Sequence, residues 1–251
     1  MGILLRFGPG WEARLREAGL DRWDALLALP ARGGPIAASR TSRTDRVEAA
    51  GVDLHRKHYR YPTARDRRRA ALRGTLFGRP RARRELDALL ALGARGVPVA
   101  EPVVYAERRV RGWLHETLLF TVTVPGAAPI DAHDAPALHA LARTLRAAHD
   151  AGIELGTPAL RDVVVSRADG APAPTLLDLP RARIRSASLA GSLRARDLAR
   201  IVVGLQLEGA RGGIDAFLDA YGPIDRARLE REAARRRARE EERGGAGGLR
   251  D

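Results

Sequence analysis

Lys57 is the only lysine of a chain that has 44 lysine and arginine residues. Asparagine is absent and Gln206 is the single glutamine, so the arginine excess is a bias of the whole composition and says little about partners. A position that keeps lysine under such a bias points to a need for an ammonium, which is a compact point charge, whereas a guanidinium is a planar fork. Lys57 is therefore the first candidate for chemistry, and a solvated strand lysine is the alternative interpretation.

An aspartate that directly follows a short apolar segment is the second candidate. The run Thr175-Leu176-Leu177 is typical of a strand, and Asp178 comes immediately after it, at the entry to a loop. Carboxylate oxygens are the ligands that magnesium prefers, and the end of a buried strand is a common place for them. An ordinary strand-end or turn aspartate is the alternative.

Other chemistries find little support in the residue types. The chain has no cysteine, which excludes thiolate metal sites, cysteine nucleophiles and disulfide scaffolds. The six histidines are scattered, and the G-x-S-x-G motif of serine hydrolases is absent. No G-x-G-x-x-G is present either. Gly33-Gly34 and the run 39–44 are compatible with a phosphate-facing hairpin, and equally with an ordinary loop.

The spacing of apolar residues predicts the elements that must position these side chains. Helices are expected over Trp11–Leu29, Ala82–Ala94, Ala135–Ala151, about Leu193–Leu207 and about Ile214–Tyr221. Strands are expected over Val52–Tyr59, Pro102–Glu107, Leu114–Val124, Val163–Val165 and Thr175–Leu177. The alternating acidic and basic blocks of Arg226–Arg243 predict a solvated helix with a frayed end.

The order of these elements predicts an α+β fold with two lobes. Pro125-Gly126 is typical of a hinge, with strands and one helix before it and mostly helices after it. We expect a small, mainly β N-terminal lobe and a larger, mainly helical C-terminal lobe. The predicted boundaries are an N-terminal helical segment at 1–31, the small lobe at 32–124, the helical lobe at 125–222 and a charged tail at 223–251.

The composition is that of a folded, non-membrane chain. Of the 251 residues, 45% are hydrophobic and 30% are charged, which argues against general disorder. No apolar run approaches 18 residues, and no secretory signal precedes the first helix, so a cytoplasmic protein is expected. The net charge of +13 suits an acidic partner such as an anionic lipid leaflet.

Six stretches occur in an order that resembles a known family. They are Leu54–Arg60, Arg81–Leu86, Gly96–Pro102, the run up to His149-Asp150-Ala151-Gly152, Leu176–Leu179 and Arg196–Ala199. Together they resemble the bacterial lipopolysaccharide kinases of the Kdo and heptose kinase type, over about two thirds of the chain. The resemblance implies a protein-kinase-like fold and transfer of a phosphoryl group from ATP to a sugar hydroxyl of a glycolipid, the lipopolysaccharide core. It also implies work at the inner face of the inner membrane.

The resemblance assigns roles to individual residues. Lys57 would hold the α and β phosphates of ATP, and Glu85 would pair with Lys57 and keep it aimed. Asp178 matches the metal-binding aspartate of the family, and Asp162 stands where a metal-binding asparagine is expected, so both would bind Mg²⁺. Asp197 resembles the helix aspartate that braces the catalytic loop. The residues 32–124 would then bind ATP, and 125–222 would form the catalytic-type lobe.

The catalytic loop departs from the family pattern. Leu155 stands where the histidine is expected, and Thr157 where the catalytic aspartate is expected. A threonine does not accept a proton at neutral pH as a carboxylate does, and a positioned general base contributes about 10²- to 10⁴-fold to a rate. Another acid could substitute, and Glu154 and Asp150 are close in sequence. We therefore expect an impaired kinase.

Two alternatives remain open at this point. The first is a pseudokinase that binds nucleotide or a partner and acts as a scaffold or regulator, which Leu155 and Thr157 favour. The second is a nucleic-acid-binding protein that uses basic clusters such as 65–73 and 235–237. Nucleic acid is the less favoured partner, because aromatic residues make up only 4% of the chain and no stacking platform is evident.

Overall fold

The chain forms two compact units, each of which is described here by itself. The computed structural model describes residues 2–71, 79–156 and 158–247. The first unit comprises Met1–Gly93 and Ala100–Thr123, and the second comprises Ala94–Val99 and Val124–Asp251. An antiparallel sheet dominates the first unit and helices dominate the second, which confirms the predicted α+β class.

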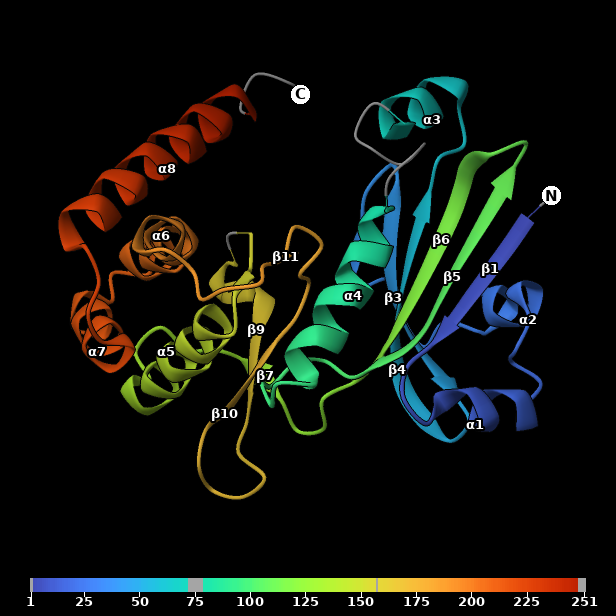
Figure 1. The fold of residues 1–251 in the computed structure, drawn as a ribbon, viewed down its shortest axis with the longest axis horizontal. Coiled ribbons are helices and arrows are strands. Elements are labelled where there is room, and N and C mark those ends of the chain that lie inside the picture. Colours follow the sequence, from blue (N-terminus) through green and yellow to red (C-terminus); the bar gives the residue numbers. More distant parts are fainter. Residues whose placement is uncertain (1, 72–78, 157, 248–251) are drawn as a thin grey trace. The chain divides into compact units, whose positions relative to one another are not determined.

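The first unit is built on a six-stranded antiparallel sheet with the strand order β1-β5-β6-β4-β3-β2. Its strands are β1 (Gly2–Phe7), β2 (Ala37–Ala38), β3 (Ser42–Ala49), β4 (Val52–Arg60), β5 (Pro102–Val110) and β6 (Trp113–Val122) (Figure 1). The three central strands are long and rich in β-branched and aromatic residues, which suit a pleated surface covered on both faces.

The N-terminal segment corrects the prediction of a helical stretch over residues 1–31. Residues 2–7 form the edge strand β1, which pairs along β5 from Gly2 opposite Arg109 to Phe7 opposite Val104. The run Ile-Leu-Leu lacks the apolar–polar alternation that marks a half-buried strand, so its sequence did not indicate one. Ile3 and Leu4 are exposed on it.

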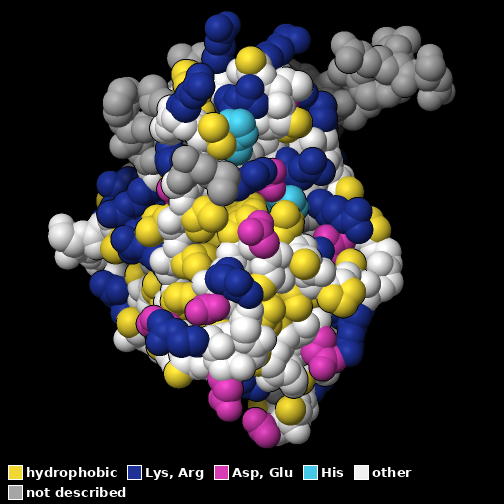
Figure 2. Space-filling view, turned by 90° about the vertical axis from the view of Figure 1, so that its right-hand side faces the viewer, with side chains coloured by type: hydrophobic (Ala, Val, Ile, Leu, Met, Phe, Trp, Pro, Cys, Tyr) yellow, Lys and Arg dark blue, Asp and Glu magenta, His cyan; other side chains and the backbone are white. Residues whose placement is uncertain are grey.

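On the face that Figure 2 displays, hydrophobic side chains gather near the middle, with lysine and arginine side chains around them.

The single helix predicted over Trp11–Leu29 is also wrong, because the segment forms two helices. They are α1 (Trp11–Glu17) and α2 (Trp23–Ala28), separated by a turn in which Gly19 has a φ of +70°. A left-handed residue ends a helix, and glycine adopts that conformation without a steric penalty.

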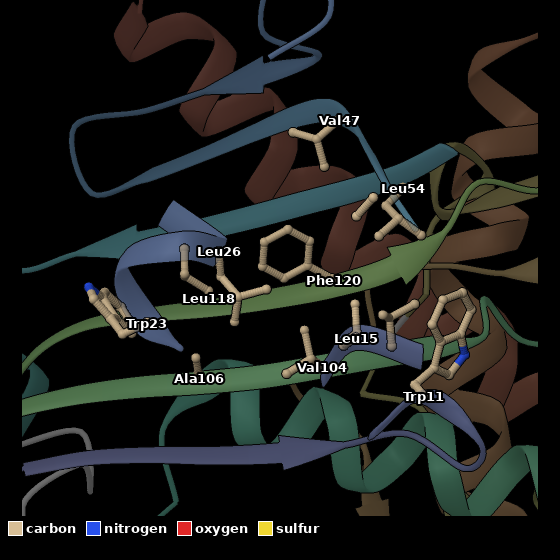
Figure 3. Close-up of a cluster of buried hydrophobic side chains, with 12 residues drawn as sticks. Trp11, Leu15, Trp23, Leu26, Val47, Leu54, Val104, Ala106, Leu118 and Phe120 are labelled. Atoms are coloured by element: carbon tan, nitrogen blue, oxygen red, sulfur yellow. The ribbon is translucent and has the colours of Figure 1, made fainter. Parts of the chain in front are cut away.

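Helices α1 and α2 cover one face of the sheet and create its main core. Trp11, Leu15, Trp23 and Leu26 pack on sheet residues that include Phe120, as Figure 3 shows. Burying side chains of this size contributes roughly 1.5–3 kcal/mol each, so this layer is a main source of the unit's stability.

Helix α4 (Arg81–Gly93) covers the opposite face. Tyr59, Tyr105 and Leu119 point to this face from three neighbouring strands and contact Ala82 and Leu86 of the helix. The short helix α3 (Ala64–Ala70) begins with a capping box, in which the Thr63 side chain and the Asp66 side chain each satisfy the other's backbone N–H. The predicted basic stretch continues to Arg73, but residues 72–78 lie outside the described part of the chain.

The second unit combines four helices with two small β-sheets. The helices are α5 (Ala135–Asp150), α6 (Gly191–Leu207), α7 (Arg211–Tyr221) and α8 (Arg226–Gly247). The strands are β7 (Ala128–Pro129), β9 (Val163–Ser166) and β10 (Ala173–Leu176) in one sheet, and β8 (Ile153–Glu154) with β11 (Arg183–Ile184) in another. A 3₁₀ turn, η2 (Leu160–Asp162), precedes β9. No helix of the described residues is apolar over a length that could span a membrane.

Helix α8 corrects the prediction of a solvated tail. It packs against α6, and Leu229 and Ala233, four residues apart and therefore on one face, are buried in the contact. A pocket of about 160 Å³ lies between α6, α7 and α8, lined by Val202 and Leu218 among others. The narrow apolar stripe among many charges explains why the sequence pattern indicated a solvated helix.

One ion-pair cluster joins the three central strands of the sheet. Glu116 of β6 accepts hydrogen bonds from His58 Nε2 of β4 (2.9 Å) and from Arg108 of β5. The hydrogen bond from His58 and, after it, the Arg108 guanidinium hold the pKa of Glu116 at about 2. A carboxyl whose pKa is depressed in the folded state stabilises it above the unfolded pKa of about 4.3, and that stability disappears as pH falls toward 2.

We therefore expect Glu116→Gln to lower the free energy of unfolding at pH 7, and to lower it less as pH decreases below about 4. Urea unfolding of both proteins between pH 7 and pH 3 measures the difference. Glu12→Gln removes an exposed pair with Arg16 and serves as the control, with an expected effect of at most about 0.5 kcal/mol at either pH. A Glu116→Gln effect that did not change with pH would contradict the assignment.

Candidate active site

Lys57 and Glu85 form a buried ion pair between the sheet and α4. Lys57 lies in the middle of β4, between Thr44 of β3 and Leu119 of β6. Its Nζ donates to Glu85 Oε1 at 2.5 Å. The Glu85 side chain is 1% exposed and the Lys57 side chain 17% exposed. Because a buried carboxylate is costly unless it is paired, Glu85 holds the ammonium in one place on the sheet.

The position of Glu85 follows from the helix period. Ala82, Leu86 and Leu89 of α4 are buried against the sheet, and Glu85 lies on the same stripe. An acid on the apolar stripe of a helix is the sequence signal that separates Glu85 from the neighbouring exposed charges. The structure thus brings together two residues that are 28 positions apart and that the sequence had paired only through a resemblance.

The run 39–44, for which the sequence left a hairpin and an ordinary loop both open, contains the turn of a hairpin formed by β2 and β3. Its turn is closed by Ser39 N donating to Ser42 O at 2.7 Å and by a 2.8 Å hydrogen bond between the two serine hydroxyls. Arg40 at the tip donates to Asp66 Oδ1 at 2.5 Å. The Thr63 hydroxyl, followed by Arg40, lowers the pKa of Asp66. The hairpin is therefore tied to the start of α3.

In the second unit, Asp162 and Asp178 are close enough to influence each other. Burial and then the charge of Asp178 raise the pKa of Asp162, although a hydrogen bond from the Ala159 backbone N–H (2.9 Å) opposes the shift. Leu177 N also donates to the Asp162 carbonyl oxygen at 2.8 Å, which ties the two loops together. Asp178 has a φ of +45°, an uncommon conformation for a residue with a side chain. Two carboxylates and a strained backbone are features of a functional site.

Asp197 is fully buried in α6 and joins three elements of the second unit. Its Oδ2 accepts a hydrogen bond from Leu155 N at 2.6 Å and lies 3.5 Å from His149 Nε2. The other ring nitrogen of His149 is 2.7 Å from the Tyr221 hydroxyl. Asp197 therefore fixes the backbone of the loop that follows β8.

Sequence reasoning missed His149 and Tyr221, which complete this buried network. His149 lies four residues after the buried Leu145 on the apolar stripe of α5, and that spacing is the signal that was available. Asp134 is the N-cap residue of α5, and its side chain accepts a hydrogen bond from Ala137 N at 3.1 Å.

The two acids proposed as substitutes for a catalytic aspartate are both held by arginines. Glu154 is 3% exposed and accepts hydrogen bonds from Arg185 (2.5 Å) and from Arg196. Asp150 accepts from Arg146 and, at 2.7 Å, from Arg194, and these arginines lower the pKa of Asp150. Asp150 is therefore a weaker proton acceptor than a free carboxylate, and both carboxylate oxygens of Glu154 are occupied by arginines.

The comparisons with known proteins identify the family. The description "Lipopolysaccharide kinase (Kdo/WaaP) family" belongs to the family model that matches residues 31–221. The chain belongs to the lipopolysaccharide kinase family. A solved structure titled "WaaP in complex with acyl carrier protein" shares the fold, with a TM-score of 0.64 and 22% identity over 94% of this chain and 98% of that chain. No curated protein matches the chain.

Membership in the lipopolysaccharide kinase family implies the use of ATP and a glycolipid acceptor. Thr157, which we expect from the sequence at the position of the family's catalytic aspartate, lies outside the described residues. Its neighbour Gly156 has a φ of +73°, and a Cβ there would lie 2.5 Å from Arg181 Cβ. Glycine is therefore required at position 156, and Leu155 on its other side is buried.

The raised pKa of Asp162 generates a prediction for stability. An acid whose pKa is higher in the folded state destabilises the fold once it ionises, so the cost appears as pH rises above about 3.9. Asp162→Asn retains an oxygen to accept the Ala159 N–H but carries no charge. We expect the variant to melt at a higher temperature than the parent at pH 7.5 without added metal, and this advantage to shrink toward pH 4. Thermal unfolding across that range measures it.

The exposed Asp169, in the turn between β9 and β10, gives the matched control. Asp169→Asn makes the same charge change and should leave the melting temperature nearly unaltered. A lower melting temperature for Asp162→Asn at pH 7.5 would show that the Asp162 charge is stabilising and would refute the proposed repulsion.

Proposed function

We propose that the chain transfers the γ-phosphoryl group of ATP to a sugar hydroxyl of a glycolipid, the lipopolysaccharide core. The Lys57–Glu85 pair is the observation that carries this proposal. The only ammonium side chain of the chain is held at 2.5 Å by a buried glutamate. A fixed point charge of this kind suits the α and β phosphates of ATP, and phosphoryl transfer depends mainly on positioning and charge neutralisation.

The carboxylates of Asp162 and Asp178 fit a magnesium ion. Magnesium prefers hard oxygen ligands and commonly uses one or two carboxylates together with substrate phosphates. Burial, and after it the charge of Asp178, raise the pKa of Asp162, and a divalent cation at the two carboxylates would offset both effects. Among the described residues no group of three or more acidic, histidine or cysteine side chains could hold a metal, so waters and phosphates must complete the shell. The ion would neutralise charge on the β and γ phosphates.

The chain's own residues divide the remaining work. Lys57 binds and orients the nucleotide, and Glu85 keeps Lys57 in place. Asp197 holds the loop at Leu155, two residues before Thr157. The acceptor hydroxyl must lose its proton, and with Glu154 and Asp150 engaged by arginines the loop offers no strong base nearby. We therefore propose that transfer is slower than with an aspartate at position 157, by about 10²- to 10⁴-fold.

A pseudokinase is the second candidate function. Leu155 in place of the family's histidine and the arginine pairs of Glu154 favour it, because they indicate a loop that supports structure more than proton transfer. In that case the protein binds nucleotide or a partner without turnover. For either function we propose contact with the anionic inner face of the inner membrane, at about 1 kcal/mol per surface cation. Exposed hydrophobic side chains such as Trp113 and Ile3 also suit such a surface.

One prediction of the proposed function concerns nucleotide binding. We expect MgATP to bind the purified chain with micromolar to millimolar affinity and Lys57→Ala to abolish the heat of binding in calorimetry. Lys57→Arg should not restore it, since a planar fork alters the geometry. Because Lys57 is the only lysine, an amine-reactive ATP acyl phosphate should also modify this one side chain, and excess ATP should protect it. Absence of binding by the parent protein would remove the kinase mechanism.

Another prediction distinguishes an active kinase from a pseudokinase. Thr157→Asp should raise the rate of phosphate transfer from ATP to purified lipopolysaccharide by about 10²- to 10⁴-fold if only the base is missing. Thr157→Asn has the same size without the carboxylate and should stay at the parent rate. An unchanged rate for Thr157→Asp, with MgATP binding intact, would favour the pseudokinase.

A further inference from the structure

Three arginines from two helices gather on one side of the second unit. Arg196 and Arg200 are four residues apart on α6 and therefore lie on the same face. Arg236 reaches this face from α8, and its Nη2 donates to the Arg196 carbonyl oxygen at 3.4 Å. The side chain of Arg196 is engaged by Glu154. The charges of Arg200 and Arg236 act on each other on this face.

The surroundings of Arg236 disfavour the charged form of its guanidinium group. Burial and then the charge of Arg200 lower the pKa of Arg236, while Asp197 and Glu232 oppose the shift. Both acids have other partners: Asp197 accepts from Leu155 N, and Glu232 lies 3.5 Å from Arg235 Nη1. The Nε of Arg236 is buried and has no hydrogen-bond partner among the described residues. A buried donor without a partner is uncommon and destabilising.

The same face lies next to the candidate magnesium site. Helix α6 packs on η2, the turn that carries Asp162, and a Cβ at Gly204 would lie 3.0 Å from Leu160 Cδ1. Gly204 is one turn of α6 beyond Arg200, and the charge of Arg200 acts on Asp162 as well as on Arg236. Arg200 therefore lies near enough to act on both the acid and the second arginine.

We propose that Arg200 and Arg236 bind a phosphate group carried by the sugar acceptor and so orient its hydroxyl toward Asp162. Arginine forks bind phosphate oxygens through paired, charge-assisted hydrogen bonds. An oxyanion between the two guanidinium groups would offset their repulsion and give the buried Nε an acceptor. The inference rests on the proposed function for the identity of the acceptor, but the anion site is testable without nucleotide.

The test measures binding of glucose 1-phosphate by calorimetry, without nucleotide or magnesium and at constant ionic strength set with chloride. The full chain with Lys57→Ala is used, so that the nucleotide site does not bind the phosphate. Adding Arg236→Gln should weaken binding by about tenfold or more, as expected for a lost charge-assisted pair. Arg235→Gln removes the same charge from the adjacent residue, whose side chain is 68% exposed, and should leave binding nearly unchanged.

A stability measurement distinguishes a binding role from a structural one. Because Arg236 is repelled by Arg200 and has an unpaired donor, Arg236→Gln should melt at a temperature no lower than Arg235→Gln does. Arg200→Gln provides a second test of phosphate binding should Arg236→Gln fail to fold. Equal binding by the Arg235→Gln and Arg236→Gln proteins would overturn the proposal, since it would show only diffuse surface charge.

Two further measurements identify the source of the phosphate and distinguish failure of the anion site from failure of the proposed kinase function. Glucose 1-phosphate should bind at least as tightly as inorganic phosphate, and binding confined to inorganic phosphate would overturn an acceptor site. In the background that retains Lys57, Arg236→Gln should bind MgATP like the parent. Failure of MgATP to bind the parent would end the proposed kinase function, whereas the loss of sugar phosphate binding in Arg236→Gln would still support the anion site.

Discussion

Removing a carboxylate from water costs several kcal/mol unless a cation or a set of donors replaces the water. Six carboxylates are buried in the described part of this chain. The contacts between these carboxylates and their partners join the secondary-structure elements to one another. The six are Asp45, Asp66, Glu85, Glu107, Glu154 and Asp197. Arginine pairs with four of them, at Asp45, Asp66, Glu107 and Glu154. Asp197 instead holds a backbone N–H and faces a histidine, and Glu85 holds the lysine.

This division explains why one ion pair stands out in a chain rich in ion pairs. Arg56 is an example of an arginine that meets a buried acid, since its Nη1 donates to the carbonyls of Leu27 and Leu29 and its Nη2 to Asp45. Such pairs support the fold. An ammonium in the middle of a sheet, in a chain whose composition strongly favours arginine, is a departure that packing does not require. Family membership gives the departure its meaning, since the family's members are kinases.

The second unit contains the opposite arrangement, in which like charges face each other. Asp162 lies beside Asp178, and Arg236 lies beside Arg200. In each pair one group has a pKa shifted by burial and then by its like-charged neighbour, a pattern that is common at functional sites. The loop that follows β8 is supported by Asp197 and by the arginines that pair with Glu154. Arg185 and Arg196 occupy both carboxylate oxygens of Glu154, directly before Leu155.

The sequence by itself determined the α+β class, most helices and the residues of chemical interest, because periodicity and composition are local properties. Helices α4 and α5 and strand β4 lie within one or two residues of their predicted bounds. The edge strand β1 and the break at Gly19 were not predictable in this way, since neither leaves a periodic signal. Tertiary structure alone decided which acids are buried and which charges meet. His149 reaches Asp197, and Arg236 reaches Arg200, only because helices distant in sequence pack together, and burial then decides whether each charge stabilises the fold or strains it.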